Sequence, residues 1–233
     1  MSGGSARSDI LARVRYASAG APGESVRAAR EALGRAPSAP SPAGNTLTDF
    51  IVNVMANHGT VACAADRTGT VKAVAAYLYD HFKSQRLVAG SDARLAALPW
   101  RDGGVLPRFG ALEEGEKVAL SYARVGVAET GAIVTFTGKA TPAANNLLAE
   151  HHIVLLDCDD VVDTLEDAWD RVNPALDKEG RPRGLNFIAG PSSTADIEGR
   201  LVYGAHGPRA WHVIVIGERA EQALQQAQQL RPQ

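Results

Sequence analysis

Segments with helical periodicity alternate with short apolar runs along most of this 233-residue chain, and this alternation restricts the fold more than any other feature. Residues 71–82 place apolar side chains at helical spacing, which predicts an amphipathic helix. Short apolar runs at 60–65 and 87–89 flank this helix and are typical of strands. Strands separated by helices favour parallel pairing, because the helix carries the chain back to the starting edge of the sheet. We therefore predict an α/β fold with a mostly parallel sheet.

The other elements follow from the same patterns. Further strands are expected at 117–123, 132–136, 152–156, 185–189 and 212–216, the last two closing the sheet. Further helices are expected from Thr46 to about residue 58, at 92–98, from about 163 to 173, and at 218–230. The third of these is expected to be capped by Asp163 and Glu166 and to end at Asn173-Pro174.

Residues 1–45 differ in composition from the rest of the chain. They are rich in Ala, Gly, Ser, Pro and Arg, and they end in a Pro/Ser run at 36–44. Short helices are plausible from Ser8 and at 24–33, but neither has a face wide enough to form a core alone. We interpret residues 1–45 as a mobile or partner-docking arm, and residues 46–233 as the α/β domain.

Composition excludes several classes of function. The net charge of −2, without a Lys/Arg stripe, indicates no nucleic-acid partner. No run approaches the roughly 20 apolar residues of a membrane span, and no apolar segment typical of a signal peptide follows the first residues. The two cysteines, Cys63 and Cys158, fit reduced thiols better than a disulfide framework. A cytoplasmic protein is expected.

The stretch from Gly190 to Gly217 is the strongest candidate for a functional site. It places a Gly-Pro-Ser-Ser-Thr turn, an Asp-Ile-Glu step and a His-Gly-Pro turn between two apolar runs. Small residues after a strand let backbone amides converge on an anion, and hydroxyl groups add donors. A helix beginning at Thr194 would add the positive end of its dipole. The alternative is that Ser193 or Thr194 is an ordinary N-cap and Asp196 a first-turn acid.

Two other residues carry possible acid–base or nucleophilic chemistry. His206 lies in a tight turn beside Gly207, where it could act as an acid, a base or only a turn-stabilising side chain. Glu129 lies in an Ala-Glu-Thr-Gly turn between strands, so it should lie at an end of the sheet. Only analogy with α/β enzymes of the CoA-transferase type, in which a glutamate at a strand end is the covalent nucleophile, implies such a role for it. The alternative is a structural acid that pairs with Arg124 or Arg200.

Metal and cofactor sites are not indicated. His151 and His152 are adjacent on an expected strand, so their side chains should point to opposite faces, and zinc-type spacing is absent. The chain has no Gly-x-Gly-x-x-Gly fingerprint, and its two cysteines are too few for a four-thiolate iron–sulfur cluster. Nothing in it is therefore expected to carry two electrons by itself.

The motifs of this chain resemble those of a known family. GPSSTADIE, the following His-Gly-Pro turn and the terminal β-run are similar to the signature of the lactate-utilisation protein C family, whose members carry a LUD domain. Ala128-Glu129-Thr130-Gly131 and the run from His152 are further matches, and the resemblance covers roughly residues 118–217. It implies a Rossmann-like three-layer fold of the NagB/RpiA/CoA-transferase group. Many relatives have a basic residue after Gly-Pro-Ser where this chain has Ser193; Arg200 or Arg209 could take its place.

The resemblance also implies a function. It indicates a component of a cytoplasmic system that oxidises L-lactate to pyruvate together with iron–sulfur partner proteins. This chain would contribute a small-anion site or only assembly contacts. The candidate catalytic residues are Glu129, Asp196, Glu198 and His206. The candidate anion-binding residues are Gly190, Ser192, Ser193, Thr194, Thr130 and Gly207.

Two alternatives belong to other functional classes. The first is a stand-alone enzyme acting on a phosphorylated, folate-like or CoA-linked substrate, in which Glu129, or Asp196 with His206, would act without a partner. The second is a ligand-sensing module that binds a small anion without catalysis. This module would tolerate substitution of Glu129 and Glu198.

Overall fold

A computed structural model describes most of the chain. The described residues are 6–17, 20, 23–34, 44–180, 182–197 and 200–230. The chain divides into two compact units, Met1–Ala39 and Pro40–Gln233. No helix in the described residues is long and apolar enough to cross a membrane.

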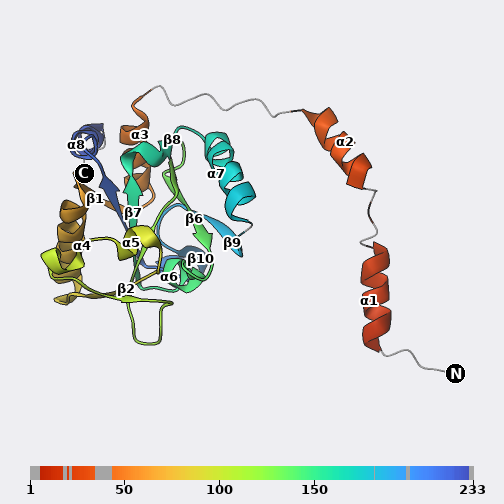
Figure 1. Cartoon of the computed structure of the whole chain (residues 1–233), viewed down its shortest axis with the longest axis horizontal. Coiled ribbons are helices and arrows are strands. Elements are labelled where there is room, and N and C mark those ends of the chain that lie inside the picture. Colours follow the sequence, from red (N-terminus) through yellow and green to blue (C-terminus); the bar gives the residue numbers. More distant parts are fainter. Residues whose placement is uncertain are drawn as a thin grey trace. The chain divides into compact units, whose positions relative to one another are not determined.

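The first unit contains two helices, α1 (Ala6–Ala17) and α2 (Gly23–Leu33), drawn in red and orange in Figure 1. Neither helix has a buried residue. Gly34 follows α2 with a φ of +67°, a left-handed conformation that glycine adopts without steric cost. The Pro/Ser run that we interpret as a linker lies, apart from Gly44, outside the described residues.

The second unit is built on a six-stranded parallel sheet (Figure 1). Its strands, in spatial order, are β1 (Thr60–Ala64), β12 (Ala210–Ile216), β7 (His151–Asp157), β4 (Val118–Tyr122), β2 (Arg86–Ala89) and β3 (Leu106–Phe109). Every neighbouring pair in this sheet is parallel. The predicted α/β class with a mostly parallel sheet is thus confirmed.

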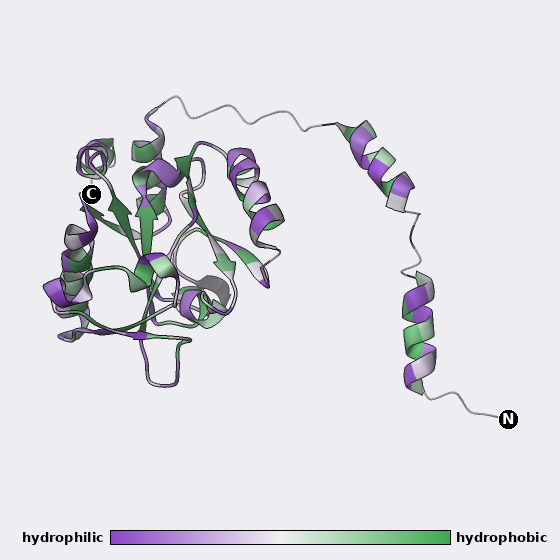
Figure 2. Ribbon diagram, viewed as in Figure 1, coloured by the Kyte–Doolittle hydropathy of each residue, from purple (hydrophilic) through white to green (hydrophobic). Residues whose placement is uncertain are grey.

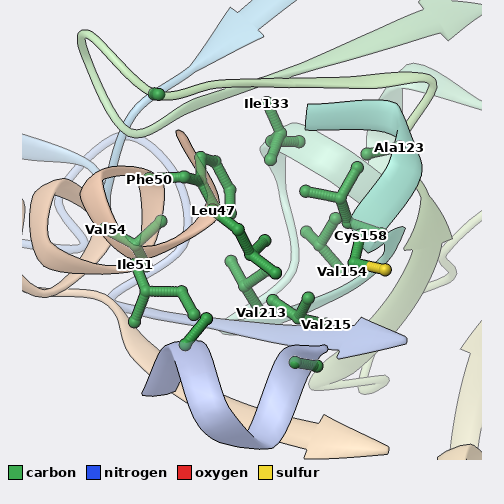
Figure 3. Packing of buried hydrophobic residues seen from close by; sticks show 14 of the residues in the cluster. Leu47, Phe50, Ile51, Val54, Ala123, Ile133, Val154, Cys158, Val213 and Val215 are labelled. Carbon is green, nitrogen blue, oxygen red and sulfur yellow. The ribbon is translucent and has the colours of Figure 1, made fainter. Parts of the chain in front are cut away.

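Helices cover both faces of this sheet. The helices α3 (Thr46–Ala56) and α8 (Ala220–Leu230) pack on one face, and α4 (Arg67–Phe82) packs on the other. In Figure 3, Phe50 and Leu47 of α3 point toward Val213 of β12 and Val154 of β7. Figure 2 shows the hydrophobic strands between helices that present hydrophilic residues outward. This arrangement explains the helical periodicity, because each helix buries one apolar stripe against the sheet.

A second sheet of four strands lies beside the parallel sheet. It contains β8 (Val161–Val162), β5 (Val125–Val127), β6 (Ala132–Thr137) and β9 (Gly184–Ile188), in that order. One face packs on α3 through Ile133, and the other face packs on α7 (Leu165–Glu179). A Cβ at Gly126 would lie 2.6 Å from Leu156 Cδ2 and 3.1 Å from Phe50 Cε2, so glycine permits the close approach of β5.

The shorter elements complete the second unit. They are α5 (Ala93–Ala96), η1 (Trp100–Gly103), α6 (Ala143–Leu147), η2 (Cys158–Asp160), and the strands β10 (Ser193–Ile197) and β11 (Arg200–Tyr203). Cys63 and Cys158 are both free thiols, and burial raises the pKa of Cys63 to about 12.

Three local predictions were wrong. The run at 185–189 does not close the parallel sheet; β9 pairs antiparallel with β6 in the second sheet. Pro174 does not end α7, which continues to Glu179 because Ala175 and Leu176 still pack against the second sheet. That packing offsets the lost hydrogen bond of an interior proline. The N-terminal cap of α7 is a capping box of Thr164 and Asp167, one residue beyond the predicted pair.

Candidate functional site

The Gly-Pro-Ser-Ser-Thr segment leads into a strand, and no helix begins at Thr194. Ser193 and Thr194 belong to β10, which pairs antiparallel with β11. Ser193 lies opposite Tyr203, and Thr194 lies opposite Val202. Thr194 and Val202 are β-branched and suit a paired strand. A helix dipole therefore does not contribute to anion binding at this position.

The first turn of this segment contacts the His-Gly-Pro turn directly. The backbone N–H of Ser192 donates to the carbonyl of Pro208 at 2.8 Å, and the N–H of Gly204 donates to the carbonyl of Ser192 at the same distance. A Cβ at Gly207 would lie 3.1 Å from the Ser192 Cβ. Two of the predicted anion-binding residues, Ser192 and Gly207, thus lie side by side, and His206 is in the same loop.

This loop lies at the amino ends of the parallel strands. The N–H of Arg209 donates to the carbonyl of Glu150 at 3.0 Å, and β12 and β7 begin immediately after these two residues. Open α/β sheets more commonly bind ligands beyond the carboxyl ends of their strands. Ser192, His206 and Gly207 therefore lie at the opposite edge of the sheet from the one that this general rule favours.

The loop borders an open cleft of about 620 Å³. Its ionisable lining residues are Glu116, Lys117, Glu150, His206 and Arg209. Lys117, Glu150 and Arg209 directly precede β4, β7 and β12. Glu150 forms an ion pair with Arg209 and a longer one, at 3.7 Å, with Lys117. One half-buried carboxylate thus positions two cations. Glu116 is a second carboxylate of this lining and is ion-paired with Arg108, so Lys117 and Arg209 share Glu150 as their carboxylate partner. Two cations that share one carboxylate keep further N–H donors for a small anion.

Below this cleft, α4 meets the first residues of β7 and β12. The hydroxyl of Tyr77 lies 2.8 Å from His151 Nδ1, and the Tyr77 ring stacks on His212 at a centroid distance of 4.3 Å. Burial lowers the pKa of His151, and the charges of Arg209 and His81 lower it further. His151 therefore favours its neutral form, which has one donor and one acceptor nitrogen.

Gly190 and Thr130 lie apart from the cleft residues, next to the end of α3. The amide of Asn57 donates to the carbonyl of Thr130 at 2.8 Å. Gly190 has a φ of +100°, and a Cβ there would lie 2.4 Å from the Asn57 carbonyl oxygen. Asn57 therefore contacts both the Ala-Glu-Thr-Gly turn and the Gly-Pro-Ser-Ser-Thr turn. Close packing against the Asn57 backbone explains why residue 190 is a glycine.

Glu129 makes a structural contact. Its Oε2 accepts a hydrogen bond from the backbone N–H of Leu165 at 3.1 Å, at the start of α7. A carboxylate at a helix N-terminus satisfies a backbone donor and interacts favourably with the helix dipole. This partner differs from the arginines that we considered as alternatives.

Two of the predicted catalytic residues have no described side chain. Asp196 belongs to β10 by its backbone only, and Glu198 lies outside the described residues. His151 and His152 contact different partners: His151 contacts Tyr77, and His152 Nε2 lies 2.6 Å from Ser121 Oγ. Among the residues that the structure describes, no group of three or more His, Cys, Asp or Glu side chains could hold a metal ion.

The sequence patterns did not single out a polar group at the carboxyl ends of the strands. The hydroxyl of Tyr122, the last residue of β4, donates to Asp157, the last residue of β7, with both carboxylate oxygens at 2.9 Å. The Arg94 guanidinium lies over the Tyr122 ring, 4.0 Å from its centroid. One signal in the sequence could have found this group: two apolar runs each end on a polar residue, Tyr122 and Asp157. Parallel pairing of neighbouring strands brings such ends together.

Comparisons with known proteins agree with these motifs. Residues 115–216 match the LUD domain family. Lactate utilization protein C of Macrococcus caseolyticus is 33% identical over 107 residues, 46% of this chain and 46% of that protein. The protein of the same name from an Exiguobacterium strain is 28% identical over 149 residues, 59% of this chain and 64% of that protein. The matches thus span about half to two thirds of these relatives.

A solved structure shows the same fold. A DUF162 family protein from Deinococcus radiodurans aligns with a TM-score of 0.56 and 23% identity, over 74% of this chain and 96% of that chain. This similarity supports the three-layer architecture described above. The sequence comparisons lead to one result: residues 115–216 match the LUD domain family, and the chain is similar over this region to proteins named lactate utilization protein C.

Proposed function

We propose that the protein acts in L-lactate utilisation and binds a small organic anion in the cleft at the amino ends of β4, β7 and β12. One observation carries the proposal: every residue that lines this cleft falls within residues 115–216, the segment that matches the LUD domain. Relatives of this segment are named lactate utilization protein C. The paired cations Lys117 and Arg209 suit a carboxylate of the size of lactate or pyruvate.

The oxidation itself would depend on partner proteins. Oxidation of L-lactate to pyruvate releases two electrons and two protons, so an electron acceptor is required. The chain has two cysteines, fewer than the four thiolates of an iron–sulfur cluster. We therefore assign electron transfer to iron–sulfur partners in the cytoplasm, and the arm of residues 1–45 is a candidate for docking them.

Arg209 supplies the positive charge that many relatives place at the position of Ser193. Its guanidinium lines the cleft and is ion-paired with Glu150, whereas Ser193 lies exposed at the start of β10. Arginine binds carboxylates through two parallel N–H donors, so Arg209 is the main anchor in this proposal. Lys117 adds a second charge, and His206 lies within the same lining.

Calorimetric titration of the purified chain with L-lactate and pyruvate tests this site. A Lys117→Gln/Arg209→Gln double variant should bind either anion at least about tenfold more weakly, because charge-assisted hydrogen bonds are lost. Lys72→Gln/Arg219→Gln removes the same two charges outside the cleft and should bind as the wild type does. Equal affinity in both double variants, or no saturable binding to the wild type, would contradict the proposed site.

A further inference from the structure

A larger pocket adjoins the proposed lactate cleft along the amino edge of the parallel sheet. The strands along this edge are, in spatial order, β12, β7, β4, β2 and β3. The lactate cleft lies at the first three of them, and the pocket lies at the last three, around the residues with which β2 and β3 begin. Both are lined by residues 115–117, which directly precede β4. The pocket and the cleft are therefore consecutive along one edge.

Contacts between their residues also join the pocket to the cleft. The ring of Phe82, which lines the pocket, lies edge-on to the ring of His151, with 4.7 Å between the centroids. His151 directly follows Glu150 of the lactate cleft, and its backbone N–H donates to the carbonyl of Lys117 at 2.9 Å. Lys117 lines both the pocket and the cleft. A carboxylate held by its ammonium group can thus belong to a molecule that extends into the pocket.

Apolar residues line much of the pocket. They come from the end of α4 and from β2, β3 and β4, and they are Phe82, Leu87, Val88, Leu106, Pro107 and Val118. Leu106 is 58% exposed, whereas Leu87 and Val118 are buried. Covering exposed apolar surface with another apolar group is favourable, because both surfaces are removed from water. The lining therefore favours a ligand with an apolar part.

The charged residues of the pocket do not select a second anionic group. Glu116 accepts two hydrogen bonds from the Arg108 guanidinium, the one from Nε at 2.6 Å, and this pairing lowers the pKa of Glu116. Arg108 also forms an ion pair with Glu113 at 3.2 Å. Arg86 is exposed at the start of β2, where its charge can stay in water while an apolar group covers the pocket. The pocket thus suits the uncharged part of a ligand whose carboxylate lies at Lys117.

The size of the pocket and the cleft exceeds that of lactate. The pocket has a volume of about 820 Å³, and the cleft one of about 620 Å³. Pockets of about 300–1,000 Å³ are typical of sites for drug-sized ligands, so lactate would fill only a small part of this space.

We propose that the site takes, besides lactate, 2-hydroxy or 2-oxo acids with a large apolar side chain such as a benzyl group. The carboxylate binds at Lys117 and Arg209, and the apolar group covers Phe82 and Leu106 in the adjoining pocket. Because lactate uses the same carboxylate anchor, this wider substrate class rests on the proposed function.

Calorimetric titration of the full chain with L-lactate and L-3-phenyllactate tests the proposal. Phenyllactate has the carboxylate and hydroxyl of lactate and adds a phenyl ring, so it should bind at least about tenfold more tightly. Leu106→Ser should weaken binding of phenyllactate about threefold or more, because apolar surface is lost, and should leave binding of L-lactate unchanged. Leu106 is exposed, so its replacement should not impair folding, which the melting temperature verifies. Leu230→Ser removes an equally exposed leucine at the end of α8 and should change neither affinity.

The Lys117→Gln/Arg209→Gln variant separates this proposal from the proposed function. It should weaken binding of both acids about tenfold or more, since both use the same anchor. If L-lactate binds and phenyllactate binds no more tightly, the wider substrate class is wrong and the lactate site stands. If Leu106→Ser leaves the affinity for phenyllactate unchanged, the ring does not lie in this pocket and the proposal is overturned. If neither acid shows saturable binding to the wild type, the proposed function fails as well.

Discussion

Lowering the pH from 7 to 5 should reduce the free energy of unfolding by about 4 kcal/mol and the melting temperature by roughly 8–16 °C. Two buried histidines are responsible. Burial lowers the pKa of His152 to about 3, and burial together with nearby His81 lowers the pKa of His212 to about 4. Among the residues that the structure describes, none offers His152 Nδ1 or His212 Nε2 a hydrogen bond that could stabilise an added proton.

The direction follows from proton binding in the two states. In the unfolded chain a histidine titrates near pH 6.5, so it takes up a proton well above the pH at which the folded chain does. The full stability is present above about pH 6.5 and is lost as the pH falls toward the folded pKa values. At pH 5 each histidine contributes about 2 kcal/mol of this loss, since one pKa unit corresponds to about 1.36 kcal/mol.

Urea unfolding at pH 7, 6 and 5 measures this dependence. His212→Gln should remove about half of this pH dependence, because only His152 then remains to titrate. The glutamine amide can still bond Thr60 Oγ1, which lies 2.7 Å from His212 Nδ1, so the variant keeps this contact. His206→Gln changes an exposed histidine and should leave the dependence as it is in the wild type. A stability that stays constant between pH 7 and pH 5 would show that the two histidines are not held neutral.

Gly190→Ala should lower the free energy of unfolding by about 2–4 kcal/mol. The residue has a φ of +100°, and the new Cβ would lie 2.4 Å from the carbonyl oxygen of Asn57, a backbone atom at the end of α3. The loop must therefore move away from α3, which would also disturb the contact between Ser192 and Pro208.

Gly115→Ala is the matched control. Gly115 has a φ of +84°, but a Cβ there meets no atom within 4 Å, so only the backbone strain of roughly 1–2 kcal/mol remains. The free energies of unfolding of both variants, measured in urea, separate the cost of backbone strain from the cost of the steric clash at Gly190. Equal losses in the two variants would mean that Gly190 is required for its backbone angle alone.

The order of helices and strands in the second unit was largely predictable, because it depends on local patterns. The periodicity of residues 71–82 reflects a helix that buries one face, and the apolar runs around it are buried strands. The sheet to which a run belongs is not a local property. Residues 185–189 fit either sheet equally well, and only their pairing with β6 decides between them.

The candidate site was predictable only in part. Ser192, His206 and Gly207 were identified from turn-forming residues, and the structure brings their loops together. Lys117 and Glu150 could not be found in this way, because each is an ordinary charged residue before an apolar run. They meet because β4, β7 and β12 are neighbours, and this order depends on contacts between distant segments.

Thr194 shows a different limit. A hydroxyl residue after Gly-Pro-Ser is equally compatible with a helix cap and with a strand, so the local sequence does not discriminate between them. Pairing with β11 selects the strand. The helix dipole expected at this turn is therefore absent, and the positive charge at the proposed anion site comes from side chains instead.

Growth on L-lactate tests the central claim most directly. A strain that lacks the gene would receive the wild type, the Lys117→Gln/Arg209→Gln variant or the Lys72→Gln/Arg219→Gln control, with the folding of each protein verified. We expect the wild type and the control to restore growth and the Lys117/Arg209 variant to fail. If that variant restores growth fully, or if the strain grows on L-lactate without the gene, the proposed role of this cleft in lactate utilisation is wrong.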